Sequence, residues 1–299
     1  MEIAWKTITM EDADIIRSYY KKEQSRSCEF TFANNYLWAP HYHIRYAIVE
    51  GMLVFLSDNP PGSVSFPLGD GNIRQAVETL WKYFDEKGME FRMHLVTPIQ
   101  FARLDELMPG TFQIDYDQDA ADYVYEAEKL LTLSGKKLHS KRNHINKFKS
   151  EHENWQYEKI TSENLEDCLQ MAHKWCEKNG CFEAEPGKKK EFCVTLNALK
   201  NLEALNLQGG LLRLDGEVVA FSIGEPCSDD TFVVHIEKAF AEIQGAYPMI
   251  NQQFVENEAA GYTYINREED MGDEGLRKAK QSYYPAFLQE KGIVTLKQK

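Results

Sequence analysis

The sequence has few cysteines, and their pattern gives them no evident metal or disulfide role. The six cysteines include no Cys-x-x-Cys pair, and their spacing fits neither a zinc ribbon nor a disulfide scaffold. We therefore expect buried free thiols in a reducing compartment. The histidines are not spaced as metal ligands either, so the sequence predicts no metal site.

Long apolar runs and signatures of hydrolases are also missing. No run approaches the roughly 18 apolar residues that a membrane-spanning helix needs. The stretch Met1–Lys6 shows no basic segment followed by an apolar one, so no signal peptide is predicted. No Gly-x-Ser-x-Gly elbow or Walker loop occurs, which argues against serine hydrolase and NTPase chemistry. We expect a cytoplasmic chain without a transmembrane segment.

The composition is that of a folded, acidic protein. The 299 residues are 43% hydrophobic and 12% aromatic, which is ample for a buried core. The net charge of −13 argues against general binding of DNA, because nucleic-acid-binding surfaces are usually basic. A local basic patch could still bind RNA or an anionic head group. The length suggests about two domains.

Helices and strands alternate in a similar order in the two halves of the chain. Each half shows a helix, a hairpin and then strands separated by helices, which predicts an α/β fold (α+β, with mixed sheets) and helices on the sheet faces. The hairpin signal is strongest at Asp215-Gly216. The predicted organisation is a first domain at 1–134, a linking helix at 135–150 and a second domain at 151–299.

The predicted linking helix is basic in an acidic chain. Residues 135–150 contain six Lys or Arg and no acid. A helix of this kind can bind phosphate, with Arg142 as a bidentate donor, Lys141 as a point charge and Asn143 reading a polar edge. The alternative is a solvated helix that balances the acidic body, which is the usual role of a run of like charges.

A second charged segment follows a predicted strand at 262–265. It runs from Asn266 to Lys280, contains two glycines, and precedes a helix predicted at 274–288. Open α/β sheets bind ligands where strands end, so we expect functional side chains here. The alternative is a solvated loop with a helix cap at Asp273.

Four separated segments resemble a known family. They are Ser27–Asn34 with Tyr36 and Trp38; Lys141–Phe148; His235–Ala239 with Gly245–Pro248; and Asn266–Lys280 with Ser282–Pro285. Together they resemble the bacterial family of unknown function DUF2156, which is similar to the C-terminal domain of phosphatidylglycerol lysyltransferases. The resemblance implies two tandem acyltransferase domains of the GNAT type.

The resemblance also implies a reaction. Lysyltransferases of this kind and the similar Fem-type enzymes transfer an aminoacyl group from aminoacyl-tRNA, to a lipid hydroxyl or to a peptidoglycan amine. This chain differs from relatives that use acetyl-CoA, whose pyrophosphate loop reads Arg/Gln-x-x-Gly-x-Gly/Ala. The corresponding segment here begins with Glu242 and ends with Tyr247. An acid at this place disfavours a pyrophosphate.

The predicted activity is therefore acyl transfer, with an aminoacyl group from a phosphorylated donor such as aminoacyl-tRNA, onto a small amine, hydroxyl or lipid head group. The candidate residues, by role, are catalytic Glu237, Lys238, Asp270 and Tyr283; donor-binding Lys141, Arg142, Asn143, Arg267 and Lys280; and Glu29, Tyr36 and Trp38 at an acceptor cleft. Glu237 and Asp270 are alternatives for the general base, and Tyr283 for a proton donor. A structural salt bridge and a core tyrosine are the competing interpretations of the same residues.

Two other functions remain open at this stage. One is an N-acyltransferase of the same fold that uses acyl-CoA as its donor. The other is a non-catalytic protein that binds a nucleotide, a lipid or RNA. No cofactor is required by the sequence; aminoacyl-tRNA or acyl-CoA would enter as a donor substrate.

Overall fold

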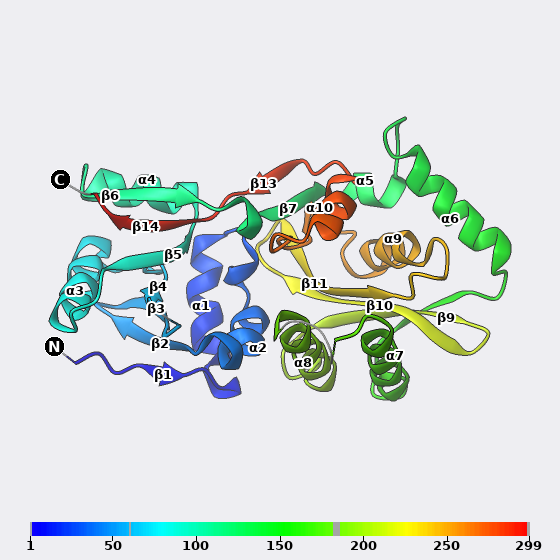
Figure 1. Ribbon diagram of the computed structural model, residues 1–299, viewed down its shortest axis with the longest axis horizontal. Helices are drawn as coiled ribbons and strands as arrows, with labels where there is room; N and C mark the ends of the chain where they lie inside the picture. Colours follow the sequence, from blue (N-terminus) through cyan, green and yellow to red (C-terminus); the bar gives the residue numbers. More distant parts are fainter. Residues whose placement is uncertain (1, 60, 182–185, 298–299) are drawn as a thin grey trace. The chain divides into compact units, whose positions relative to one another are not determined.

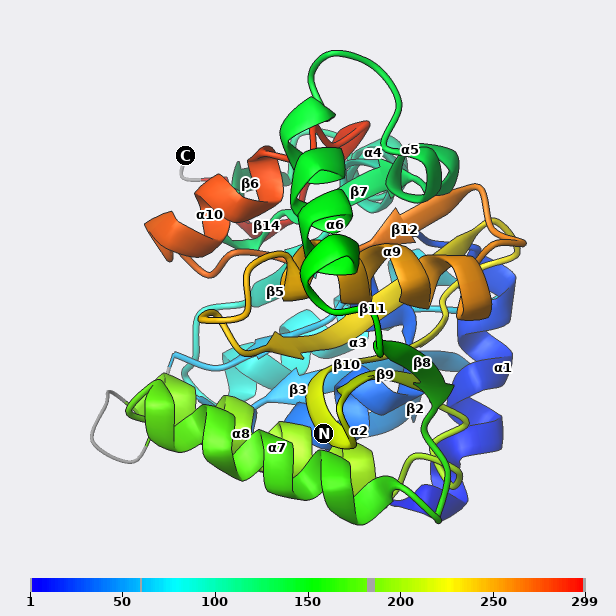
Figure 2. The same ribbon diagram turned by 90° about the vertical axis from the view of Figure 1, so that its right-hand side faces the viewer.

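The computed structural model describes residues 2–59, 61–181 and 186–297, and the chain forms two compact units (Figures 1 and 2). Unit 1 comprises Met1–Asp122, Glu269–Glu274 and Leu288–Lys299. Unit 2 comprises Tyr123–Glu268 and Gly275–Phe287. Each unit is built on a seven-stranded sheet. Both sheets are mixed, as the order of elements in the sequence predicts.

The sheet of unit 1 has the strand order β1-β2-β3-β4-β5-β14-β6. Its strands are β1 (Lys6–Thr7), β2 (Ile44–Val49), β3 (Met52–Ser57), β4 (Ser63–Val64), β5 (Arg92–Val96), β6 (Phe112–Tyr116) and β14 (Gly292–Leu296). The pair β4 and β5 is parallel and the other printed pairs are antiparallel. The helices are α1 (Ala13–Glu23), α2 (Phe32–Tyr42), α3 (Ile73–Glu86) and α4 (Pro98–Leu107).

Helix α3 shows why these segments fold as they do. Its buried residues Ala76, Val77, Leu80 and Phe84 recur at helical spacing and form one apolar face. The side chain of Asn72 accepts a hydrogen bond from the amide of Gln75 at 3.1 Å, which caps the first turn. The stretch from Gly69 to Asn72 therefore leads into a capped helix start.

The sheet of unit 2 has the strand order β13-β7-β12-β11-β10-β9-β8. Its strands are β7 (Asp122–Glu126), β8 (Gln156–Lys159), β9 (Gln208–Leu214), β10 (Glu217–Pro226), β11 (Thr231–Ala239), β12 (Tyr264–Asn266) and β13 (Phe287–Gln289). Strands β11 and β12 are parallel, whereas β8 to β11 form an antiparallel series. The β9–β10 hairpin turns at Asp215 and Gly216, as predicted.

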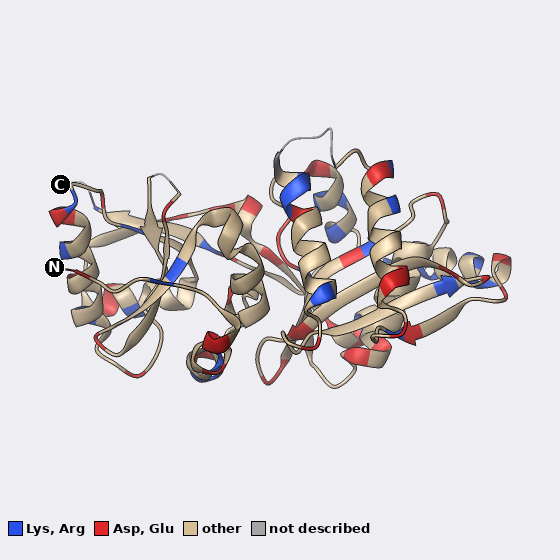
Figure 3. Ribbon diagram, turned by 90° about the horizontal axis from the view of Figure 1, so that it is seen from below, with Lys and Arg blue, Asp and Glu red and all other residues tan. Residues whose placement is uncertain are grey.

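Helices cover both faces of this sheet. The helices are α5 (Ala127–Thr132), α6 (His139–Glu151), α7 (Leu165–Lys178), α8 (Pro186–Lys200), α9 (Ala246–Glu258) and α10 (Glu274–Gln281). Helix α9 lies on one face with α5 and α6 against it, and α7 and α8 lie on the other (Figure 2). Charges of both signs occur along α7 and α8 (Figure 3).

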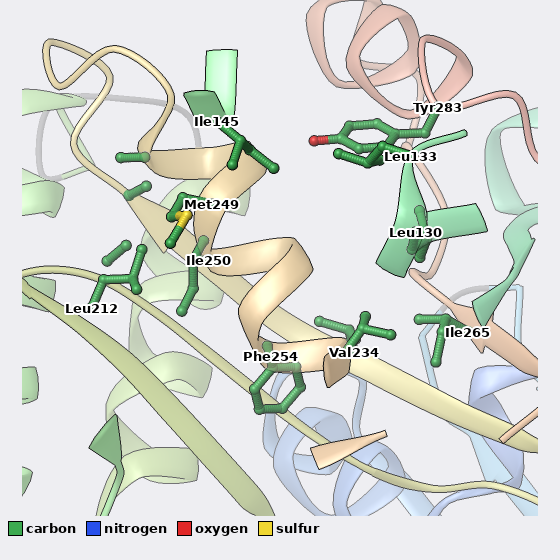
Figure 4. Packing of buried hydrophobic residues seen from close by; sticks show 14 of the residues in the cluster. Leu130, Leu133, Ile145, Leu212, Val234, Met249, Ile250, Phe254, Ile265 and Tyr283 are labelled. Carbon is green, nitrogen blue, oxygen red and sulfur yellow. The ribbon is translucent and has the colours of Figure 1, made fainter. Parts of the chain in front are cut away.

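The core of unit 2 forms between α9, the sheet and helices α5 and α6. Met249, Ile250 and Phe254 of α9 are fully or almost fully buried against strand residues such as Leu212 and Val234. Figure 4 shows these side chains together with the ring of Tyr283, which lies beside Leu133. This cluster fixes α9 and α6 over the sheet and so determines where their polar residues point.

Two strands lie in a different unit from the one that the predicted domain boundaries assign them to. Strand β7 lies within the predicted range 1–134 but pairs with β12 in the sheet of unit 2. Strand β14 lies within 151–299 but is inserted between β5 and β6 in unit 1. The basic helix α6, predicted as a linker, belongs to unit 2. Sequence order alone assigns strands to contiguous halves, whereas pairing depends on tertiary contacts.

The last predicted helix is too long. Helix α10 ends at Gln281 rather than at residue 288, and Phe287–Gln289 form strand β13. Tyr284 has a φ of +54° and precedes Pro285, and a residue before proline is disfavoured in the helical region. Within the described ranges, none of the helices combines the length and the apolar character needed to cross a bilayer.

Candidate functional site

Glu237 lies at the centre of a buried polar cluster in unit 2. It belongs to β11, directly opposite Ser222 of the antiparallel strand β10, so both side chains point to the same face of the sheet. The adjacent parallel strand β12 ends at Asn266, and Arg267 follows it. Helix α9 covers this face and contributes Asn251.

The Glu237 carboxylate is held by two donors. Arg267 Nη2 donates to Oε1 at 2.8 Å, and Asn251 Nδ2 donates to Oε2 at 3.0 Å. The side chains of Glu237 and Arg267 are each 12% exposed. Ion pairs with this little solvent access interact far more strongly than surface pairs, and they also have a large desolvation cost. Each charge therefore needs the other to offset the free-energy cost of its burial.

Aromatic rings and a second cation surround this ion pair. The Arg267 guanidinium lies 4.8 Å from the ring centroid of Tyr283 and 5.6 Å from that of Tyr125. Lys141 Nζ lies 4.1 Å from the Tyr283 ring centroid. Burial raises the pKa of Tyr283, and its hydroxyl stays protonated at neutral pH. Burial, and then the charge of Arg267, lowers the pKa of Lys141.

Four of the predicted residues thus meet in one place. Glu237, Arg267, Tyr283 and Lys141 come from β11, the end of β12, the turn after α10 and helix α6. Strand alternation predicts that Lys238 faces the other side, and its contacts agree. Lys238 Nζ pairs with Glu191 of α8 and lies 3.9 Å from the ring centroid of Trp175 of α7.

Lys280, predicted to bind donor, contacts the backbone after β12. Its buried Nζ donates to the carbonyl oxygens of Arg267 and Glu268, at 2.5 and 3.0 Å. These bonds hold the strand end in the conformation that aims Arg267 at Glu237. Glu268 itself has a φ of +57°, which a residue with a side chain adopts at a cost.

The basic helix α6 packs against the start of α9. Arg142 Nη1 donates to the carbonyl oxygens of Leu133 and Gly135, and Asn143 Nδ2 lies 3.1 Å from His139 Nε2. A Cβ on Gly245, the residue before α9, would lie 2.4 Å from the carbonyl oxygen of His144. Gly245 is therefore required for this close approach, and the α6 backbone covers the N-terminus of α9.

A second buried ionic group lies beside the cluster on β11. His235 occupies a β-bulge between Val234 and Ile236. Its Nδ1 contacts Glu268 Oε1 at 2.6 Å, and its Nε2 contacts Glu225 Oε1 at 3.2 Å. Burial lowers the pKa of His235, but the two carboxylates outweigh it and raise the pKa to about 10. His235 is an imidazolium at neutral pH and cannot serve there as a base.

The remaining predicted residues lie in unit 1. Asp270 is fully buried and its Oδ1 accepts from the amide of Gly272 at 2.9 Å. Tyr36 stacks on Phe32, and Trp38 contacts the rings of His41 and Tyr42; both are half-buried on α2. Glu29 Oε1 accepts from Lys291 Nζ at 2.6 Å.

Lys291 forms an ionic cluster that the sequence did not reveal. It is fully buried, and its Nζ lies 2.7 Å from Asp122 and 3.8 Å from Glu269. Ligand atoms of Cys28, Glu29 and Asp122 lie within 4.8 Å of one another, as in a metal site. The Lys291 ammonium supplies the positive charge at this position, so the residues fit a lysine-centred cluster better than a metal centre.

Ser222, Asn251 and Tyr125 were missed by sequence reasoning. Ser222 lies in a β-strand and Asn251 in a helix, with no local motif around either residue. One signal was present: Asn251 is a polar residue on the apolar face of α9, between Ile250 and Phe254. A buried polar residue on such a face is an informative exception.

One family model matches most of this sequence. The model described as phosphatidylglycerol lysyltransferase, C-terminal, matches residues 20–294. This chain belongs to that family. The resemblance predicted from the sequence is confirmed.

The comparisons extend to solved structures. The chain is 38% identical to a conserved protein of unknown function from Bacteroides thetaiotaomicron, with a TM-score of 0.93, over 99% of this chain and 100% of that one. It is 26% identical over 187 residues to an uncharacterized protein of Mycoplasmoides gallisepticum, which is 59% of this chain and 56% of that protein. The match thus spans little more than half of that relative.

Two further structures share the fold at low identity. L-PGS from Bacillus licheniformis is 15% identical, with a TM-score of 0.65, over 100% of this chain and 95% of that one. FemX is 11% identical, with a TM-score of 0.60, over 98% of this chain and 96% of that one. The predicted fold class, a mixed α/β chain built on two mixed sheets, is confirmed. Family and fold support an acyltransferase related to these proteins.

Proposed function

We propose that this protein transfers an aminoacyl group from a phosphorylated donor, such as aminoacyl-tRNA, to a small amine or hydroxyl, including the hydroxyl of a lipid head group. The observation that carries the proposal is the buried pair of Glu237 and Arg267, flanked by Tyr283 and Lys141. The pair occurs in a chain of the phosphatidylglycerol lysyltransferase C-terminal family, and the fold is shared with L-PGS and FemX.

The cluster offers the groups that direct acyl transfer requires. The acceptor amine or hydroxyl must lose a proton as it attacks the carbonyl carbon, and a carboxylate can take it. Glu237 is the base in this proposal, with Asp270 of unit 1 as the alternative. The Arg267 guanidinium can stabilise negative charge on the carbonyl oxygen. The protonated Tyr283 hydroxyl can return a proton to the leaving oxygen of the donor.

Helix α6 is the proposed site for the phosphates of the donor. Exposed lysines lie within the helix and just before it: Lys147 belongs to the helix, and Lys136 and Lys137 precede its start. Arg142 ties the segment before α6 to the end of α5 through two carbonyl oxygens. Its loss would therefore disturb the geometry of the basic surface as well as remove a charge.

Acyl-CoA is a weaker candidate for the donor. Relatives that use acetyl-CoA bind its pyrophosphate at the loop and helix start that correspond here to Glu242–Tyr247. The close approach of His144 to Gly245 covers this helix start with backbone atoms. Glu242 is paired with Lys178, and Tyr247 accepts from Trp175 Nε1 at 3.3 Å, so the loop is bound to α7.

A panel of donors tests the proposal. Thermal stabilisation is measured with charged tRNA, uncharged tRNA, acetyl-CoA and coenzyme A, for the native protein, Arg142→Ala and the control Lys174→Ala on α7. The proposal expects a shift with charged tRNA that is reduced in Arg142→Ala and retained in Lys174→Ala. Because the contact is ionic, the shift should fall as salt rises. A shift with coenzyme A alone would support the acyl-CoA alternative, and no shift with any donor would favour a non-catalytic role.

A further inference from the structure

The Glu237 cluster contains polar atoms that the protein does not satisfy. Within the described residues, Ser222 Oγ, Asn251 Oδ1 and Arg267 Nη1 are buried and have no hydrogen-bond partner among protein atoms. Ser222 is fully buried and Asn251 is 2% exposed. Nearly all buried polar groups in folded proteins are paired, so three unpaired atoms around one carboxylate need an explanation.

The neighbouring groups and the residue types determine which of the three atoms can donate a hydrogen bond and which can accept one. A carboxylate only accepts hydrogen bonds, so the amide nitrogen of Asn251 must face Glu237 and its oxygen Oδ1 must be the open acceptor. Arg267 Nη1 is only a donor, and the Ser222 hydroxyl can donate or accept. The cluster therefore presents one acceptor, one donor and one group that can be either.

The charges of the cluster are already balanced. Glu237 is paired with Arg267, and nearby Glu225 and Glu268 share the His235 imidazolium. On the other face of β11, Glu191 is paired with Lys238. Lys141 and Arg267 both approach the ring of Tyr283, so an added ammonium would be a third cation there. Burial, and then the charge of Arg267, lowers the pKa of Lys141, which agrees with this.

Three kinds of ligand group can be compared with these open atoms. An ammonium has only donors, so it would leave Arg267 Nη1 unpaired and would add a positive charge. A carboxylate has only acceptors, so it would leave Asn251 Oδ1 unpaired and would lie near the Glu237 carboxylate. A primary amide carries both a donor and an acceptor and has no charge, so it can satisfy Asn251 and Arg267 together.

We infer that the Glu237 cluster binds an uncharged primary amide, such as the side chain of a glutaminyl or asparaginyl group, and discriminates against a lysyl ammonium. The inference rests on the proposed function in that it makes this amide part of the transferred acyl group. It predicts a donor different from the lysyl donor in the family's name. Sites that hydrogen-bond a polar group reject analogues that leave their buried atoms unpaired.

Binding of matched ligands tests the inference directly. The probes are the N-acetyl methylamides of glutamine, glutamate and lysine, which have side chains of similar length and differ in the terminal group. Their affinities for the purified full chain are measured by isothermal titration calorimetry at pH 7. We expect the glutamine derivative to bind at least tenfold more tightly than either of the others. A preference for lysine or glutamate, or no binding of any probe, would overturn the inference.

A charge change on α9 supplies a second test. Asn251→Asp keeps the shape of the side chain but removes the amide and adds a negative charge. The glutamine derivative should then lose at least tenfold in affinity, and the lysine derivative should gain. The control Asn257→Asp adds the same charge at an exposed position of the same helix and should leave the ranking of the probes unchanged. If Asn251→Asp does not fold, the ranking by the native protein still decides.

Transfer assays separate this inference from the proposed function. Labelled glutaminyl-tRNA and lysyl-tRNA are compared as donors with the native protein. Transfer that favours lysine would contradict the inference and leave the proposed function intact. Tight binding of the glutamine derivative without transfer from any charged tRNA would support the inference and contradict the proposed function.

Discussion

Arg267, just after β12, and Glu237, near the C-terminal end of β11, form a buried ion pair with Nη2 and Oε1 2.8 Å apart. The parallel register pairs Asn266 with Val233, and the side chain of the following Arg267 reaches Glu237 further along β11. Lys280 fixes the backbone from which Arg267 extends. Burying these two charges costs desolvation free energy. The same burial places a carboxylate and a guanidinium where a bound substrate would meet them with little water present.

Removing one partner of this pair should destabilise the protein strongly. Arg267→Met would leave the Glu237 carboxylate buried without its cation, which costs about 3–5 kcal/mol in comparable pairs. Urea denaturation measures the change. The control is Lys174→Met, because Lys174 pairs with Glu217 at 3.3 Å where the two side chains are 55% and 76% exposed. Its loss should cost about 1 kcal/mol or less, and equal effects of the two changes would contradict this description of the pair.

His235 should make stability depend on pH in the alkaline range. Its pKa is raised from 6.5 to about 10 in the folded state. The stabilisation is therefore fully present below pH 6.5 and is lost as the pH rises towards 10. We expect the difference in unfolding free energy between the native protein and His235→Gln to be largest near pH 6 and to shrink by pH 10. The control His173→Gln removes an exposed histidine, and it should change the free energy of unfolding little at pH 7.

Lys291 should be essential to the stability of unit 1. Lys291→Met would leave the carboxylates of Asp122 and Glu29 without their shared cation, and Asp122 is fully buried. A loss of about 3–5 kcal/mol is expected from chemical denaturation. Adding Asp122→Asn to this variant should restore part of the loss. The control Lys82→Met removes a lysine that is 66% exposed, and it should have little effect.

Local patterns predicted individual elements well. The hairpin turn at Asp215-Gly216 follows from a signal that is visible within the segment itself, and the structure forms it. The sequence did not predict that β7 and β14 would join the sheets of opposite halves of the chain. Strand partners are chosen by long-range packing, and two apolar strands of similar length are interchangeable in a local pattern.

Sequence patterns indicated only some residues of the candidate site, because the others become close only through long-range packing. Glu237, Arg267 and Tyr283 lie in charged or aromatic segments that stand out in the sequence. Ser222 and Asn251 lie within regular elements, and they became visible only when the β10–β11 register and the orientation of α9 were known. The sequence around His235 does not indicate its two carboxylate partners, which keep the imidazole protonated in the structure.

Glu237 is the general base of the proposed reaction, and its loss should abolish most of the activity. The direct measurement is single-turnover transfer of a labelled aminoacyl group from charged tRNA, for the native protein, Glu237→Gln and Asp270→Asn. We predict that Glu237→Gln lowers the transfer rate by about 100-fold or more, the usual effect of removing a general base, while the donor still binds. Asp270→Asn should retain most of the activity. Unaltered turnover in Glu237→Gln would contradict the assignment, and unaltered turnover in both variants would remove carboxylate catalysis altogether.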